Sequence, residues 1–225
     1  MSVIPASILE PVEIVYGVYT LRGDHAGDDR WWIQRMVESD TGWMVHNDIY
    51  LDMPRQRYVT LDAELSEEWD WLYFNLRDEA GNILSAEVDQ DKLVVELNGA
   101  VMEFPFGPQS ELDYLSPFMN SLTLRRLLLQ PGQSVTRNTV WFDPDTFVPR
   151  LVQQTYTRGD DTSLEVAGQT IPAQQVEFHH HATDYRATLL VRDDGLVLRY
   201  PGLADLAFDE RASAGRGRMP PLVTG

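Results

Sequence analysis

The segment between residues 13 and 106 consists of short runs in which apolar and polar residues alternate, separated by turn residues. A period of two is typical of β-strands. The dipeptide Asn98-Gly99 is the strongest hairpin signal, because a type I′ turn needs two residues with positive φ. The connections are too short for parallel crossovers. We therefore predict an antiparallel meander with strands at 13–23, 30–39, 43–53, 57–65, 69–78, 83–90, 92–98 and 100–106.

One segment departs from this pattern and is predicted to be a helix near 116–130. Its apolar residues recur at nearly helical spacing, Ser116 suits an N-cap, and Pro117 suits the first helical position. The dipeptide Pro131-Gly132 ends the run. Strands resume afterwards, and we expect one domain over residues 1–208. Residues 209–225 are rich in Gly, Pro and Arg and are expected to be poorly ordered or draped over the surface.

Charge and composition narrow the classes of partner. The net charge is −17, with 35 acidic and 18 basic residues, which disfavours nucleic acid. There is no cysteine, so thiolate and disulfide chemistry are absent. No apolar run reaches the roughly 18 residues of a transmembrane helix, and the first residues lack the pattern of a signal peptide. We expect a cytoplasmic protein, and the sequence leaves its oligomeric state open.

Three consecutive histidines, residues 179–181, are the most suggestive chemical feature. On a strand, His179 and His181 share one face and His180 points to the other. His179 and His181 could supply two metal ligands, or one of them a general base. The interpretation we favour is that the pair lies on a polar face with Tyr185, while His180 is hydrogen-bonded near the core.

Sequence signatures of catalysis are missing. The chain has no G-x-S-x-G, H-E-x-x-H, G-x-x-x-x-G-K-[ST] or G-x-G-x-x-G motif. We therefore predict no catalytic residues, no metal and no cofactor. Whether the protein is an enzyme stays open, and the non-enzymatic reading is preferred.

Two features predict a binding surface. In the strand predicted at 69–78, Trp69, Trp71 and Tyr73 share one face by alternation. Both faces of this strand are largely apolar, so one of them packs on the core and the other on a second core or a cavity. On the predicted helix, Arg125 and Arg126 diverge by about 100°. One of them could face inward and bind phosphate, sulfate or carboxylate, although an ion pair with an acidic residue is the simpler alternative.

The second half of the chain resembles the putative glycolipid-binding family. The similar features are Pro117-Phe118, Asn120 and a Leu-x-x-Arg-Arg-Leu run at 122–127, followed by segments 153–158 and 191–203 with a terminal Tyr-Pro-Gly-Leu. The chain departs at Met119 and Thr123, where the family has threonine and proline. The resemblance implies a mainly β fold, in which an incomplete antiparallel β-barrel wraps around one or two helices. It is similar to bacterial lipoprotein carriers, with an apolar concave face.

From the residues and the resemblance together, we predict non-enzymatic binding of an amphipathic small molecule, a lipid or glycolipid, in the concave face of this half-barrel. The expected ligand-binding residues are Trp69, Trp71 and Tyr73 for contact area, Asn120, Arg125 and Arg126 for a polar head, and His179, His181 and Tyr185 along the sheet. The alternatives are a metal-assisted hydrolase using His179 and His181, and a protein-interaction scaffold.

Overall fold

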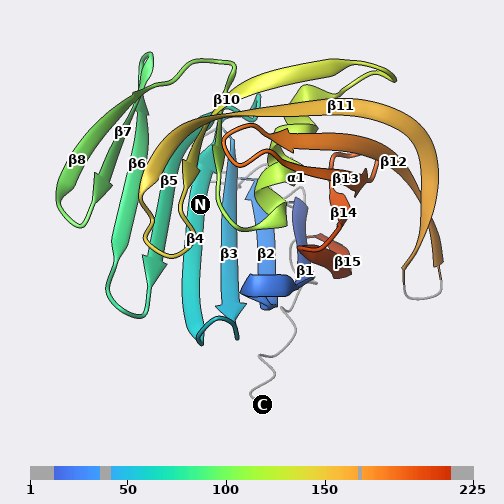
Figure 1. Cartoon of the computed structure of the whole chain (residues 1–225), viewed down its shortest axis with the longest axis horizontal. Helices are drawn as coiled ribbons and strands as arrows, with labels where there is room; N and C mark the ends of the chain where they lie inside the picture. Colours follow the sequence, from blue (N-terminus) through green and yellow to red (C-terminus); the bar gives the residue numbers. More distant parts are fainter. Residues whose placement is uncertain (1–12, 36–41, 167–168, 214–225) are drawn as a thin grey trace, which may run out of the picture.

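A computed structural model describes residues 13–35, 42–166 and 169–213. Within these residues the chain forms one sheet of fifteen strands, one α-helix and a short 3₁₀ turn at Gly23–His25 (Figure 1). The sheet is open and strongly curved, so the predicted half-barrel around a helix is confirmed. The first eight strands are β1 (Glu13–Leu21), β2 (Gly27–Arg35), β3 (Trp43–Leu51), β4 (Arg57–Leu65), β5 (Trp71–Asp78), β6 (Ile83–Asp89), β7 (Lys92–Leu97) and β8 (Ala100–Pro105).

The second half of the sheet follows a short link. Its strands are β9 (Ser110–Asp113), β10 (Ser134–Phe142), β11 (Pro149–Val166), β12 (Gln169–His180), β13 (Tyr185–Val191), β14 (Val197–Tyr200) and β15 (Ala204–Ser213), and helix α1 (Pro117–Leu127) lies between β9 and β10. Neighbours in the sequence are neighbours in the sheet within each half, and β1 pairs with β15 to join the halves.

The two edge strands of the sheet, β8 and β9, are consecutive in the sequence. Only residues 106–109 separate them, and five residue steps reach at most about 18 Å. The ends of the sheet must therefore lie close together, which is why the sheet curls. The inner faces of the two halves also meet directly, since the rings of Phe74 on β5 and Phe142 on β10 stack at a centroid distance of 4.9 Å.

One strand pair differs from the predicted antiparallel pattern. Strand β9 runs parallel to β10, with Ser110 opposite Asn138 and Asp113 opposite Trp141. A parallel pair needs a long crossover connection, and α1 with its flanking loops supplies it. The sequence of β9, Ser-Glu-Leu-Asp, gives no strand signal, because it is short and polar.

The concave side of the sheet is the core, and α1 lies inside it. Residues 117–124 of the helix are all buried, and Figure 1 shows the helix enclosed by the curved sheet. A helix buried on all sides needs no polar stripe, unlike a surface helix. No helix among the described residues is long and apolar enough to cross a lipid bilayer.

The ends of α1 are defined by local chemistry. The Ser116 hydroxyl accepts the N–H of Phe118 and donates to a carboxylate oxygen of Asp29 on β2 at 2.5 Å, so the predicted N-cap is confirmed. The helix ends at Leu127, three residues before the predicted end. Leu128 adopts the left-handed conformation (φ 43°), and its N–H bonds back to Leu124.

Strand β15 extends past the boundary expected after residue 208. Its pairing with β1 continues to Ser213, which lies opposite Glu13. The polar composition of residues 209–213 gave no indication of a strand. These residues belong to the sheet because their backbone pairs with β1. Residues 214–225, the rest of the expected tail, lie outside the described residues.

Candidate functional site

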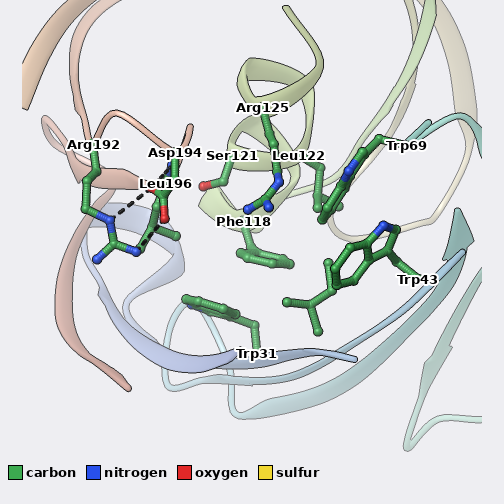
Figure 2. Close-up of a pocket in the computed structure, with 11 residues that line it drawn as sticks. Trp31, Trp43, Trp69, Phe118, Ser121, Leu122, Arg125, Arg192, Asp194 and Leu196 are labelled. Atoms are coloured by element: carbon green, nitrogen blue, oxygen red, sulfur yellow. Dashed lines mark hydrogen bonds and ion pairs between the residues drawn. The ribbon is translucent and has the colours of Figure 1, made fainter. Parts of the chain in front are cut away.

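A cavity of about 280 Å³ lies between α1 and the inner face of the first half-sheet (Figure 2). We call it the aromatic pocket. It is bounded by strands β2 and β3, the turn before β5, one face of α1 and the β13–β14 hairpin. Its lining residues are Trp31, Ile33, Trp43, Trp69, Phe118, Ser121, Leu122, Arg125, Arg192, Asp194 and Leu196.

The floor of the aromatic pocket is a stacked pair of rings. Trp31 points inward from β2, and its ring stacks on Phe118 of α1 at a centroid distance of 4.1 Å and an angle of 14°. The indole Nε1 of Trp31 is buried and has no hydrogen-bond partner among the described residues. Buried donors are normally paired, so this N–H is an unsatisfied donor in the wall of the pocket.

A second pair of rings forms the side of the pocket. Trp43 at the start of β3 stacks on Trp69 at 4.6 Å. Trp69 has a positive φ of 70° in the turn before β5, where its N–H bonds to the carbonyl of Ser66. The guanidinium carbon of Arg125 lies 4.2 Å from the Trp69 ring centroid, which is a cation–π contact. Figure 2 shows Arg125 and Trp69 side by side above the floor.

The polar rim is supplied by the β13–β14 hairpin. Arg192 donates two hydrogen bonds to the Asp194 carboxylate, at 2.9 and 2.8 Å, so the two charges offset each other. Gly195 holds this hairpin against the helix, because a Cβ at that position would lie 2.7 Å from the Arg125 Cα and N atoms. Arg125 therefore places its guanidinium at the rim beside this hairpin.

Two of the predicted ligand-binding residues, Trp69 and Arg125, line the aromatic pocket, and two others lie in a buried polar cluster. Trp71 donates from Nε1 to Glu111 at 3.0 Å, and Arg126 forms ion pairs with Glu111 at 2.9 Å and Asp70 at 2.7 Å. The two adjacent arginines thus diverge as predicted. Arg126 forms ion pairs with acidic residues, as in the simpler of the two predicted alternatives. These pairs link α1 to β9 and to the residue before β5.

Tyr73 is separated from Trp71 by a β-bulge. Trp71 lies opposite Leu65 and Tyr73 lies opposite Glu64, so Leu72 is an extra residue in β5. The bulge reverses the alternation, and Trp71 joins Phe74 in the core while Tyr73 turns to the outer face. The sequence-based grouping of Trp71 with Tyr73 on one face is therefore wrong.

The histidine triplet divides as the strand pattern predicts. His179 and His181 stack on the outer face, with ring centroids 4.0 Å apart. His179 bonds to Asp184 and His181 to Thr155, each at 2.8 Å. His180 is buried on the inner face beside Phe178. No group of three His, Asp or Glu side chains placed to hold a metal occurs in the described part of the chain.

Tyr185 lies on the other side of the sheet from the histidine pair. It is opposite His180 across the β12–β13 hairpin, and directly opposed residues share a face. The expected grouping with His179 and His181 is thus wrong, because the turn at 181–184 resets the alternation. Tyr185 and Asn120 instead both line a second cavity of about 180 Å³, which we call the Asp113 cavity.

The other lining residues of the aromatic pocket were not predicted to bind ligand, among them Trp31, Trp43, Phe118, Arg192 and Asp194. Trp31 is next to Trp32 in the sequence, and period-two alternation separates their faces. This alternation was a signal in the sequence that one of the two tryptophans faces inward. The hairpin residues carried none, because Arg192 and Asp194 approach the pocket only through the packing of Gly195 on the helix.

The fold is that of a barrel-like protein with an open sheet. A DUF1089 family protein from Pseudomonas aeruginosa has a similar structure, with a TM-score of 0.55 and 22% identity over 78% of this chain and 91% of that one. A β-barrel-like DUF1849 protein from Brucella abortus gives a TM-score of 0.54 with 13% identity, over 90% of this chain and 99% of that one. At these identities the likeness shows the fold alone.

Comparison of the sequence with protein families identifies the part of the chain that resembles a known family. The family model described as putative glycolipid-binding matches residues 112–205, which confirms the resemblance found in the sequence. Among the curated proteins, none matches the chain. The matched segment includes α1 and the β13–β14 hairpin with the polar rim, whereas Trp31, Trp43 and Trp69 precede it.

Proposed function

We propose that this protein binds an amphipathic molecule of the lipid or glycolipid class, without chemical conversion, in the aromatic pocket. The observation that carries the proposal is the presence, in one cavity, of two stacked aromatic pairs and an arginine that packs on one of their rings. Such a combination suits a ligand with an apolar body and a polar head. The family description and the barrel-like fold support binding as the general activity.

The apolar part of the ligand would lie between the Trp31–Phe118 and Trp43–Trp69 pairs. The cavity volume of about 280 Å³ is at the lower end of the roughly 300–1,000 Å³ usual for small-molecule sites. It therefore suits one alkyl chain segment or one ring, with the remainder of the ligand outside. The free indole N–H of Trp31 can donate to an ester or ether oxygen of that segment.

The polar part of the ligand would lie at the rim. Arg125 supplies a guanidinium group, and its stacking on Trp69 holds that group in place. A carboxylate, sulfate or phosphate can accept two parallel hydrogen bonds from a guanidinium. The Arg192–Asp194 pair offers both donors and acceptors to hydroxyl groups.

A pair of tryptophan variants tests the site. Trp43→Ala removes a ring from the pocket, while Trp32→Ala removes one from the outer face, where Trp32 stacks on His46. Loss of one stacked ring with its contact area is expected to weaken binding of decanoate about tenfold, since about 1.4 kcal/mol corresponds to that factor. Titration with decanoate followed by calorimetry, and native mass spectrometry of the purified protein, are the measurements. The proposal fails if no amphiphile is retained or bound, or if both variants lose affinity equally.

A second pair of variants tests the polar rim. Arg125→Gln should weaken decanoate several-fold and leave decanol unchanged, because only the first ligand carries a charge for the guanidinium to meet. Arg199→Gln is the control, since this arginine pairs with Asp205 away from the pocket. Equal effects of Arg125→Gln on both ligands would show that the residue acts through packing on Trp69, not through its charge.

A further inference from the structure

The Asp113 cavity lies on the opposite side of α1 from the aromatic pocket. Phe118, Ser121 and Arg125 face that pocket, at helical spacings of three and four residues, whereas Asn120 lies about 200° around the helix from Phe118. The cavity is bounded by the β9–α1 connection, strands β10, β12 and β14, and the residues after β10 and β12. Its lining residues are Asp113, Tyr114, Leu115, Asn120, Trp141, Pro144, Phe178, His180, Thr183, Tyr185, Tyr200 and Leu203, all of them inside the family-matched segment 112–205.

Aromatic rings make up much of this wall. Phe178, Tyr185 and Tyr200 form a cluster whose ring centroids lie 5.9 to 6.4 Å apart. Trp141 continues the surface, with its ring 5.8 Å from that of His180 and nearly perpendicular to it. Tyr185 is 41% exposed, so the cluster reaches the mouth of the cavity. Ring faces carry partial negative charge and attract cations.

Among the described residues that line the cavity, Asp113 alone carries a formal charge, and none of them is a cation. Its carboxylate accepts hydrogen bonds from Gln154 at 2.5 Å and from Asn120 at 3.4 Å, both uncharged. Burial raises the pKa of Asp113 to about 7, and the nearby Glu111 adds to the shift. The negative charge is therefore hydrogen-bonded but lacks a countercharge.

His180 supplies no positive charge to this wall. Burial lowers the pKa of its imidazole, and the two flanking histidines lower it further. Its Nδ1 lies 2.9 Å from the Thr183 hydroxyl. Its Nε2 is buried without a hydrogen-bond partner among the described residues, although the residue lines the cavity. An unpaired polar atom beside a cavity is a group that a bound molecule can satisfy.

We propose that the Asp113 cavity is a second binding site, which takes a small organic ammonium ion such as a methylated ammonium head group. The aromatic cluster contacts the cation through ring faces, Asp113 supplies the countercharge, and His180 Nε2 hydrogen-bonds a neighbouring hydroxyl of the ligand. A neutral sugar would also contact rings and an aspartate, but it would leave the buried charge uncompensated. The site is independent of the aromatic pocket, because the two cavities share no lining residue.

Two probes of equal shape test the proposal in solution. Choline and its uncharged carbon isostere, 3,3-dimethyl-1-butanol, are titrated into the full chain and followed by calorimetry. Choline is expected to bind at least about tenfold more tightly, because only it carries the charge that the rings and Asp113 attract. Equal affinity for both probes, binding of methyl glucoside in place of choline, or no binding of any probe would each overturn the proposal.

Three variants locate the binding. Tyr185→Leu removes a half-exposed ring of the cluster, and choline affinity should fall about fivefold. Tyr50→Leu, on the outer face where Tyr50 stacks on Tyr58, is the matched control and should not change it. Trp43→Ala in the aromatic pocket should also leave choline binding intact, so failure of this site and failure of the lipid-binding proposal are distinguishable.

The pH dependence gives an independent readout. The groups that face Asp113 are Glu111 on β9, Tyr156 on β11, His180 on β12 and Tyr200 on β14. Burial raises the pKa of Asp113 to about 7 and also raises the pKa of Glu111, whereas it lowers the pKa of His180 and keeps both tyrosines protonated from pH 6 to 8. Choline binding should therefore tighten as Asp113 ionises, and Asp113→Asn should reduce that trend, whereas Tyr50→Leu should leave it unchanged. A flat profile in the natural protein would contradict the assigned role of the carboxylate.

Discussion

Replacing Gly195 with alanine perturbs the contact that seats the β13–β14 hairpin on α1. Two costs arise from the structure. The φ of +91° at this position is unfavourable for any side chain, by about 1–2 kcal/mol. The new Cβ would also lie 2.7 Å from the backbone of Arg125, so the hairpin must move away, and overpacking of this kind costs about 1–3 kcal/mol. The expected total is about 3 kcal/mol, or about 6–12 °C in Tm for a chain of this length.

Gly99→Ala is the matched control for this experiment. Gly99 also sits in a hairpin with a φ of +86°, but no atom lies within 4 Å of the position of its Cβ. It should lose only the backbone part, about 1–2 kcal/mol. Urea unfolding followed by tryptophan fluorescence measures both variants, and decanoate titration measures the pocket. Gly195→Ala should also weaken decanoate, because Arg192 and Asp194 move with the hairpin. Equal stability losses, or decanoate affinity unchanged in both variants, would refute the proposed seating of the hairpin.

Two further predictions concern buried polar groups. Burial raises the pKa of Asp29 to about 6 and that of Asp113 to about 7, while the hydrogen bonds that His46 donates to Asp48 and Asp62 outweigh burial and raise the pKa of His46 to about 9. All three groups thus stay protonated to higher pH in the folded protein than in the unfolded chain, so the free energy of unfolding should fall as pH rises from about 5 to 9 in a series of urea titrations. A rise over that range would contradict these assignments, and a His46→Gln variant should flatten the upper part. Ser116→Ala should lower the free energy of unfolding by about 1–3 kcal/mol, because it removes both the N-cap and a donor to Asp29. Ser134→Ala on the exposed part of β10 should change it by less than about 0.5 kcal/mol.

The strand order of the first half-sheet could be predicted because its turns are encoded locally. Gly81 and Gly99 have φ values of 87° and 86°, which few other residues adopt, and both lie at hairpins expected from the sequence. The N-cap Ser116 is encoded in the same way. In each case the determining contacts lie within a few residues of the signal.

The candidate site could be predicted only in part, because its geometry depends on distant contacts. The bulge at Leu72 changes which residues of β5 face inward, but nothing in its local composition marks it. The parallel pairing of β9 arises because α1 returns the chain to the sheet, so the polar strand has no sequence pattern of its own. Arg125 and Trp69 were identified singly, whereas their contact across 56 positions is a property of the folded chain.

The pairing of β1 with β15 has a consequence for the order in which the molecule can be made. Residues joined in this ladder lie up to two hundred positions apart, whereas the other antiparallel ladders join strands adjacent in the sequence. At roughly 5–20 residues per second, the ribosome needs about 10–40 s between completing β1 and starting β15. Throughout that interval β1 presents an unpaired edge to the cell, and such edges pair readily with other chains. The centre of the finished sheet is therefore the part of the nascent protein that is exposed longest.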